Sequence, residues 1–375
     1  MSAAGCVGVA TPRSFESKEP FRFVSGEELP GLAIAYETYG ELSAAKDNAI
    51  LICHALSGSQ HAAGLAPGQE GQEVKQRDKG WWDLLIGPGK AIDTSRFFVV
   101  CSNNIGGCHG STGPKTVNPA TGRPYGSGFP EVRVEDWVEA QLLLAAHLGI
   151  ARFHAVVGGS IGGMQALSWA IRHPAMVARA AIIAGTPKLT TQNIAFNEIA
   201  RQSIKSDPAF SQGDYYGQEQ GPRSGLAIAR MLGHVTYLSG GDLERRFSRR
   251  RREDGDTFEI ESYLRYNGDK FADYFDANTY LIMTEALDEF NPAAEAGGDL
   301  AAALRPAAAR FLVASFRKDW RFPPQRSREL VKALLQADKR VSYAELGADG
   351  GHDAFLQDDP AYHEVVRSFL GAAEE

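Results

Sequence analysis

Residues 158–164 read Gly-Gly-Ser-Ile-Gly-Gly-Met, so one serine, Ser160, stands between two pairs of glycines. A mostly apolar run at residues 153–157 comes directly before this stretch, and residues 161–172 follow it with helical periodicity. A serine on a tight turn between a strand and a helix needs neighbours without side chains, because the strained backbone crowds the positions two before and two after it. Gly158 and Gly162 supply that room.

This order of strand, serine and helix is typical of the nucleophile elbow of an α/β-hydrolase fold. The turn directs Ser160 toward the N-terminus of the following helix, where free N–H groups and the helix dipole favour a developing negative charge. A Gly-x-Ser-x-Gly pattern also arises by chance in a chain with 40 glycines. The strand before it and the helix after it therefore carry the prediction.

Composition limits the classes of protein. A chain of 375 residues with 43% hydrophobic content can build one α/β core that carries an insertion. Its net charge of −7 argues against a general nucleic-acid-binding or membrane-surface protein, since both need a positive field. The arginine-rich run at residues 245–252 is followed by acidic residues and is interpreted as a solvated helix face or loop, with anion binding as the alternative.

The cellular compartment is predicted from the cysteines and from the start of the chain. Four cysteines lie in no close metal-ligand spacing, and the first residues lack the basic and apolar parts of a signal peptide. No apolar run approaches the roughly 20 residues that cross a bilayer. We therefore expect a reduced, cytoplasmic protein without a transmembrane segment.

Strand and helix patterns alternate along most of the chain, which predicts a mostly parallel sheet flanked by helices. Besides those around Ser160, strands are expected at residues 33–39, 49–53, 97–101, 180–184, 310–316 and 340–346, and helices at 137–148, 327–336 and 361–373. Between residues 188 and 303 the strand signals fade and helical stretches replace them, at 193–205, 225–238 and 277–289. The sequence thus predicts a catalytic core of residues 1–187 and 304–375 with an inserted helical lid of residues 188–303.

A serine hydroxyl is a poor nucleophile unless a base takes its proton, and that base needs an orienting carboxylate. Asp319 follows the predicted strand at 310–316, and His352 follows the one at 340–346. The chain order Ser160, Asp319, His352 is that of α/β-hydrolases. These three residues are the predicted catalytic triad.

The other predicted feature of the site is an oxyanion hole, made by the backbone N–H groups of Leu56, which follows an early strand, and of Ile161. His54 and His61 invite a metal-site interpretation, but no carboxylate or cysteine stands at matching spacing. We expect no metal, and histidines that pack or shape the mouth of the site.

Three further segments become diagnostic once the triad is placed: Asn-Asn-Ile-Gly-Gly-Cys-His-Gly-Ser-Thr-Gly-Pro at 103–114, Gln-Asn-Ile-Ala-Phe-Asn-Glu at 192–198 and Phe-Asp-Ala-Asn-Thr-Tyr at 275–280. With the elbow variant Gly-Gly-Ser-Ile-Gly-Gly-Met-Gln, the chain resembles the homoserine O-acyltransferase family over nearly its whole length. The resemblance implies acyl transfer from acyl-CoA, through the serine, to the side-chain hydroxyl of an amino acid in methionine synthesis. It also implies no cofactor beyond the acyl-CoA co-substrate, and a homodimer formed through the lids.

The resemblance also implies roles for residues outside the triad. Arg230 matches the arginine that grips the amino-acid carboxylate, and Asp353 matches the carboxylate that pairs with its ammonium group, so a zwitterion would be held at both ends. Arg321 matches a position where arginine accompanies succinyl-CoA and an apolar residue accompanies acetyl-CoA. A guanidinium can bind the succinyl carboxylate through two hydrogen bonds, whereas an acetyl methyl gains nothing from the charge.

The sequence leaves several alternatives open. An acetyl-CoA-dependent enzyme is the alternative for the donor, and serine remains possible as the acceptor because it differs from homoserine by one methylene, worth about 1–3 kcal/mol of discrimination. A hydrolase of the same fold would use the same triad with water as the acceptor. Arg230 and Asp353 argue against it, since a simple esterase has no need of a zwitterion clamp.

Overall fold

The computed structural model describes residues 5–253 and 255–372 and is built around an eight-stranded sheet with the order β1-β4-β6-β5-β9-β10-β11-β12. The strands span β1 Arg13–Ser17, β4 Leu32–Tyr39, β5 Ala49–Cys53, β6 Phe98–Ser102, β9 Ala155–Gly159, β10 Arg179–Ile183, β11 Arg310–Phe316 and β12 Val341–Leu346. Strand β4 runs antiparallel to both of its described neighbours, β1 and β6, and the pairs from β6 to β12 are all parallel. The carboxyl ends of the parallel strands therefore meet at one edge, where loops can bring side chains together.

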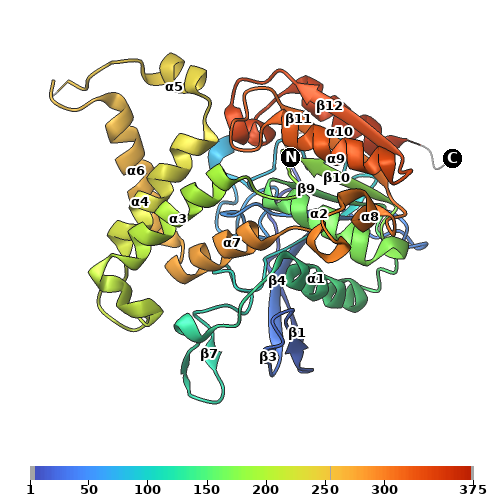
Figure 1. The fold of residues 1–375 in the computed structure, drawn as a ribbon, viewed down its shortest axis with the longest axis horizontal. Helices are drawn as coiled ribbons and strands as arrows, with labels where there is room; N and C mark the ends of the chain where they lie inside the picture. The colour runs from blue at the N-terminus through green and yellow to red at the C-terminus, as the bar shows by residue number, and fades with distance from the viewer. Residues whose placement is uncertain (1–4, 254, 373–375) are drawn as a thin grey trace.

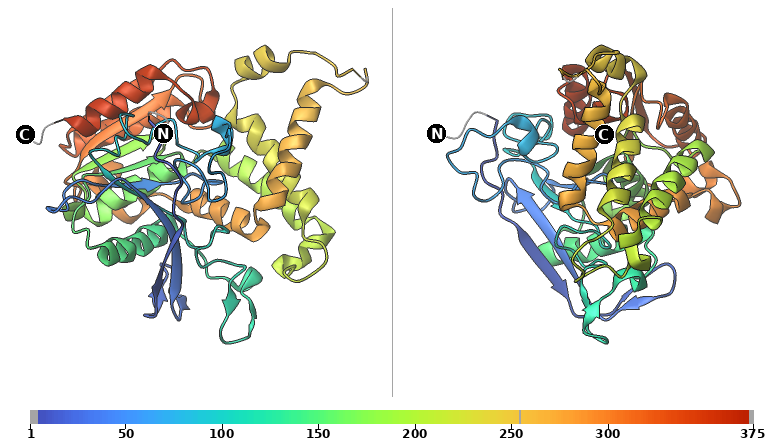
Figure 2. Two further views of the ribbon diagram at one scale, coloured as in Figure 1. Left: turned by 180° about the vertical axis from the view of Figure 1, so that it is seen from behind. Right: turned by 90° about the vertical axis from the view of Figure 1, so that its left-hand side faces the viewer.

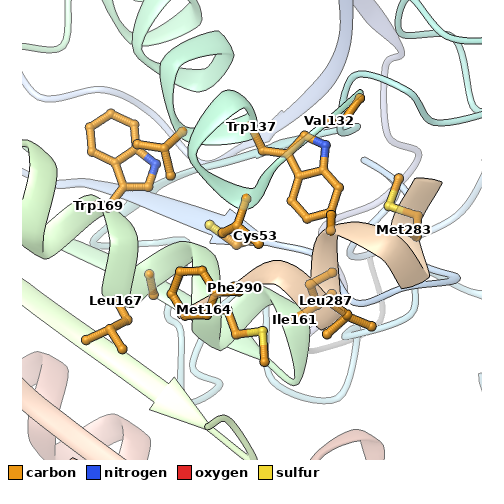
Figure 3. Packing of buried hydrophobic residues seen from close by; sticks show 14 of the residues in the cluster. Cys53, Val132, Trp137, Ile161, Met164, Leu167, Trp169, Met283, Leu287 and Phe290 are labelled. Atoms are coloured by element: carbon orange, nitrogen blue, oxygen red, sulfur yellow. The ribbon is translucent and has the colours of Figure 1, made fainter. Parts of the chain in front are cut away.

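Both faces of the sheet are covered, which explains why its central strands are continuous apolar runs. One face carries α1 Val134–Leu148, α2 Ile161–Arg172, α8 Leu300–Leu304 and α9 Pro324–Gln336, and the other carries α10 Pro360–Gly371 and the loop around Trp82. Figure 3 shows buried side chains of α1, α2 and the inserted helix α7, and Trp137, Trp169, Met164 and Leu287 all belong to this one hydrophobic cluster. This packing fixes the helix that follows Ser160.

The insertion between β10 and β11 is helical, as predicted. It contains α3 Thr191–Lys205, α4 Arg223–Tyr237, α5 Gly240–Phe247, α6 Glu259–Tyr274 and α7 Ala277–Glu289 before α8 returns to the core. Figure 1 shows α3 to α6 on the left, beyond the sheet, with α8 beside α9 on the opposite side. The left view of Figure 2, seen from behind, shows the same lid helices on the right, beyond the strands.

Two short antiparallel pairs complete the described strands, β2 Phe21–Arg22 with β3 Glu28–Leu29 and β7 Val117–Asn118 with β8 Arg123–Pro124. The arginine-rich run ends α5 and forms the loop before α6, and its side chains are exposed. Arg245 pairs with Asp242 and Arg250 with Glu259, while Arg251 lies over the ring of Phe258 at 4.1 Å. The solvated loop that the sequence predicted is confirmed.

Helix α4 is attached to the loops at the carboxyl edge of the sheet. Trp320 Nε1 donates to the carbonyl oxygen of Leu238 at 2.9 Å, and Ser239 Oγ donates to the carbonyl oxygen of Asp349 at 2.7 Å. Gly351, with φ of 70°, lies so close to this backbone that a Cβ there would stand 2.5 Å from Ser239 N. The end of α4 and the loop before η6 (Gly351–Leu356) are therefore in direct backbone contact.

Candidate active site

Ser160 occupies the sharp turn between β9 and α2, with φ of 58° and ψ of −123°. A positive φ is strained for a residue with a side chain, and it persists here because the neighbouring glycines allow a close approach. A Cβ on Gly158 would lie 2.1 Å from the carbonyl carbon of Gly162, and a Cβ on Gly162 would lie 2.0 Å from the carbonyl oxygen of Cys53. The predicted need for glycine at both positions is confirmed.

The structure brings Ser160, His352 and Asp319 into one hydrogen-bonded row. Ser160 Oγ lies 2.8 Å from His352 Nε2, and His352 Nδ1 lies 2.8 Å from Asp319 Oδ2. A carboxylate only accepts, so Nδ1 carries the proton and Nε2 is free to accept from the serine hydroxyl. All three side chains are buried. The arrangement is that of a nucleophile, a base and an orienting acid.

Asp319 is held in place by the loop that follows β11. Its second carboxylate oxygen, Oδ1, accepts the backbone N–H groups of Arg321 at 3.0 Å and Phe322 at 2.8 Å. The Phe322 ring meets the His352 ring edge to face, with centroids 4.8 Å apart. Both the position of the carboxylate and the plane of the imidazole are thus fixed before any substrate binds.

One predicted oxyanion donor, Ile161, directly follows Ser160 in the chain, and the other, Leu56, comes from the segment after β5. Ile161 begins α2, and Leu56 lies in the turn directly after β5. Within the described residues neither N–H group donates to a protein acceptor, which leaves both available to an anion at the reacting carbon.

Arg230 reaches the same region from α4 of the lid. Its Nη1 donates to Ser57 Oγ at 3.3 Å, and its guanidinium lies 4.6 Å from the centroid of Phe271 and 5.7 Å from that of Tyr237. Asp353 follows His352 and is half-buried; burial raises the pKa of its carboxyl, opposed by the charges of His352 and Arg230. A cation and a carboxylate are therefore present together close to the triad.

Arg321 is buried, with 6% of its surface exposed. Its Nη1 donates to Thr236 Oγ1 at 2.8 Å and its Nη2 to Asn197 Oδ1 at 3.1 Å. No carboxylate lies within ion-pair distance of it among the residues that the structure describes. The guanidinium thus has neutral partners that fix its direction and a charge that no described carboxylate neutralises.

Tyr237 is a site residue that sequence reasoning missed. Its ring lies 5.3 Å from the guanidinium carbon of Arg321, 5.7 Å from that of Arg230 and 6.1 Å from the centroid of the His352 ring. Tyr237 follows Arg230 by seven residues, two turns of α4, so the two share one face of that helix. That spacing is the signal that could have identified it.

The two histidines considered as metal ligands have other partners. His54 is fully buried and uses both ring nitrogens within the protein, on Ala55 and Asn104. His61 Nδ1 lies 2.9 Å from Glu37 Oε2. Within residues 5–253 and 255–372 no group of three or more side chains has the arrangement of a metal site.

Comparison with known proteins places this geometry in a family. The α/β hydrolase fold family matches residues 48–359. A homoserine O-succinyltransferase of Bordetella petrii is 55% identical in an alignment that covers 97% of this chain and 87% of the relative. The chain belongs to the homoserine O-succinyltransferase family of α/β hydrolases.

Solved structures of similar proteins agree with this family membership. A homoserine O-acetyltransferase from Bacillus anthracis is 30% identical, with a TM-score of 0.88 over 97% of this chain and 98% of that one. The esterase E22 is 31% identical, with a TM-score of 0.86 over 96% of this chain and all of that one. Proteins named as transferases and as esterases therefore share this fold. The fold alone does not determine which of the two activities a chain has, and the side chains of the site must be compared. In the described part of the chain, no helix has the length and apolar character to cross a membrane.

Proposed function

We propose that this chain transfers a succinyl group from succinyl-CoA to the side-chain hydroxyl of L-homoserine, with Ser160 carrying the acyl group between the two substrates. The observation that carries the proposal is the buried guanidinium of Arg321, which no described carboxylate neutralises. A buried charge is costly unless it is paired. The distal carboxylate of a succinyl group would be its partner, and relatives named for succinyl transfer support this donor.

In the first half-reaction, Ser160 Oγ attacks the thioester carbonyl carbon while its proton passes to His352 Nε2. The N–H groups of Leu56 and Ile161 stabilise the tetrahedral anion. The carbon–sulfur bond then breaks, His352 returns the proton to the sulfur, and CoA leaves as the thiol. Asp319 stabilises the imidazolium between the two proton transfers.

In the second half-reaction, the homoserine hydroxyl attacks the succinyl ester on Ser160 and gives its proton to His352. The bond between the carbonyl carbon and Ser160 Oγ breaks, and His352 returns the proton to the serine. The product is O-succinylhomoserine, an activated intermediate for methionine synthesis. No cofactor takes part, and the order of events is ping-pong.

Arg230 and Asp353 are proposed to bind the acceptor. A guanidinium suits the amino-acid carboxylate, and the Asp353 carboxylate suits its ammonium group. Burial raises the pKa of Asp353, and a bound ammonium would favour its charged form. This pair distinguishes the proposed transferase from an esterase of the same fold.

The test measures thiol release from succinyl-CoA and from acetyl-CoA, each with L-homoserine, L-serine or no acceptor, and identifies the products by mass. We expect homoserine-dependent release from succinyl-CoA and formation of O-succinylhomoserine. Acetyl-CoA preference would contradict the role of Arg321, and release without an acceptor would indicate a hydrolase. Ser160→Ala should release no thiol and form no acyl-enzyme.

We also infer that the protein is a homodimer formed through its lids and acts in the cytoplasm. Helices α3 and α4 expose large apolar side chains, including Ile199 and Ile228, each more than half exposed. Light scattering tests the dimer, and the mass of a single chain would contradict it. The four cysteines are free thiols, as suits a reducing compartment.

A further inference from the structure

A row of buried amide side chains connects two core helices to the turn beside Ser160. Trp169 Nε1 donates to Gln141 Oε1 at 2.7 Å, and Gln141 Nε2 donates to Gln165 Oε1 at 2.8 Å. Gln165 Nε2 donates to the carbonyl oxygen of His54 at 3.3 Å. All four residues are at most 3% exposed, so water does not compete for these bonds.

The direction of every bond in this row follows from the chemistry of its ends. An indole N–H can only donate, so Gln141 must present its oxygen to Trp169 and its nitrogen to Gln165. Gln165 then presents its oxygen to Gln141 and its nitrogen to the carbonyl oxygen of His54, which can only accept. Only one orientation of the two amides therefore satisfies every hydrogen bond in the row. In that orientation the row is bonded to the backbone of His54, at the start of the turn after β5.

The imidazole of His54 holds the same turn from the other side. Its Nε2 lies 3.0 Å from the backbone nitrogen of Asn104, which must donate, so the ring proton sits on Nδ1 and is donated to the carbonyl oxygen of Ala55 at 2.7 Å. The N–H of Gly58 donates to that same oxygen at 2.9 Å. Burial lowers the pKa of His54 to about 4, which keeps the ring in the neutral form that these bonds require.

We infer that Gln141, Gln165 and His54 are positioning residues that fix the N–H of Leu56 for the tetrahedral anion. The inference rests on the oxyanion role proposed above for Leu56. An oxyanion donor is effective only when its position is set before the reaction, so that no reorganisation is needed as charge develops. The turn from Ala55 to Gly58 has no regular secondary structure of its own, and the row ties it to α1 and α2.

The experiment compares Gln165→Met, which keeps the length of the side chain and removes both hydrogen bonds, with Ser168→Ala as the matched control. Ser168 lies on the same helix and is 3% exposed, and its hydroxyl has no hydrogen-bond partner among the described residues. The readout is the single-turnover acylation of Ser160 by p-nitrophenyl acetate. That ester passes through the same anion, so the readout does not depend on which acyl-CoA the enzyme uses.

Gln165→Met should acylate about tenfold or more slowly, with an unchanged half-saturating ester concentration, because losing an oxyanion donor costs about 10²–10³ in rate and misplacing one costs part of that. Ser168→Ala should acylate at the wild-type rate. The double variant Gln141→Met/Gln165→Met should be about as slow as the slower single variant, because both substitutions break one row.

An unchanged rate in Gln165→Met, or an equal loss in Ser168→Ala, would overturn the inference. Melting temperatures show whether each variant is folded. If Gln165→Met does not fold, Trp169→Phe provides the same test by removing the indole donor while keeping a ring in the core, and an unchanged acylation rate there overturns the inference. Failure of wild-type succinyl transfer would refute the proposed function and leave this comparison intact.

Discussion

Replacing Arg321 by leucine tests the donor preference directly. The guanidinium is fixed by Thr236 and Asn197, and its charge has no described carboxylate partner. A hydrogen bond to a charged group contributes about 1.5–3 kcal/mol, which corresponds to a factor of about 10 to 150 in kcat/KM. Arg321→Leu should therefore lower the ratio of kcat/KM for succinyl-CoA over that for acetyl-CoA by about 10- to 150-fold.

The assay measures initial rates of thiol release with each donor at saturating homoserine. Arg326→Leu is the matched control, because Arg326 also lies after β11, on α9, and pairs with Glu329 at 2.8 Å. It removes the same charge without touching the site, so its donor ratio should equal that of the wild type. A succinyl preference retained in Arg321→Leu would refute the assignment of this guanidinium to the donor carboxylate.

Three further predictions test the elbow, the lid and the acceptor site. Gly162→Ala should lower the free energy of unfolding in urea by more than about 3 kcal/mol, because its Cβ would stand 2.0 Å from the carbonyl oxygen of Cys53; normal stability would contradict this. Burial lowers the pKa of His234 to about 3, so the unfolded chain takes up a proton below pH 6.5 that the folded chain does not. The free energy of unfolding of the wild type therefore falls as pH falls. The difference in this free energy between wild type and His234→Gln should shrink by about 3 kcal/mol between pH 7.5 and 4.5. A difference that stays constant with pH would argue against a neutral His234. Asp353→Asn should raise the KM for homoserine by about 10- to 150-fold and leave acylation by p-nitrophenyl acetate unchanged, whereas equal losses in both would assign Asp353 to the chemistry.

The sequence predicted best those helices and strands whose apolar residues follow one clear period. Helices α2 and α7 and strand β11 have the predicted bounds, and the last helix, expected over 361–373, spans Pro360–Gly371 with residue 373 outside the described residues. Strand β9 begins and ends two residues later than predicted, because its final glycines were assigned to the turn although they still pair with β10. Strand β1 was missed since its sequence, Arg-Ser-Phe-Glu-Ser, is that of a polar edge. Helix α6 was missed because it is polar overall, contains Gly268 in its middle and follows the arginine-rich run.

The catalytic triad was predictable because the order of its residues along the chain is typical of this fold. The serine, the acid and the histidine follow β9, β11 and β12, which are parallel strands of one sheet, so their meeting at one edge of that sheet follows from topology. The surroundings of Arg321 were not predictable in this way. Thr236, Asn197 and Tyr237 come from two lid helices, and only the packing of the lid on the core brings them to one guanidinium.

The attachment of α4 to the loops of the triad has a consequence for how substrates enter. Lifting α4 from the core would either break the bonds that Trp320 and Ser239 make or, if those bonds held, carry the loop of His352 with it. If α4 opened in each turnover, its movement would disturb the loop that holds the catalytic base His352. We therefore expect acyl-CoA to reach Ser160 without displacement of α4. In hydrogen exchange, the last turn of α4 and the segment Gly351–Leu356 should open as a single cooperative unit.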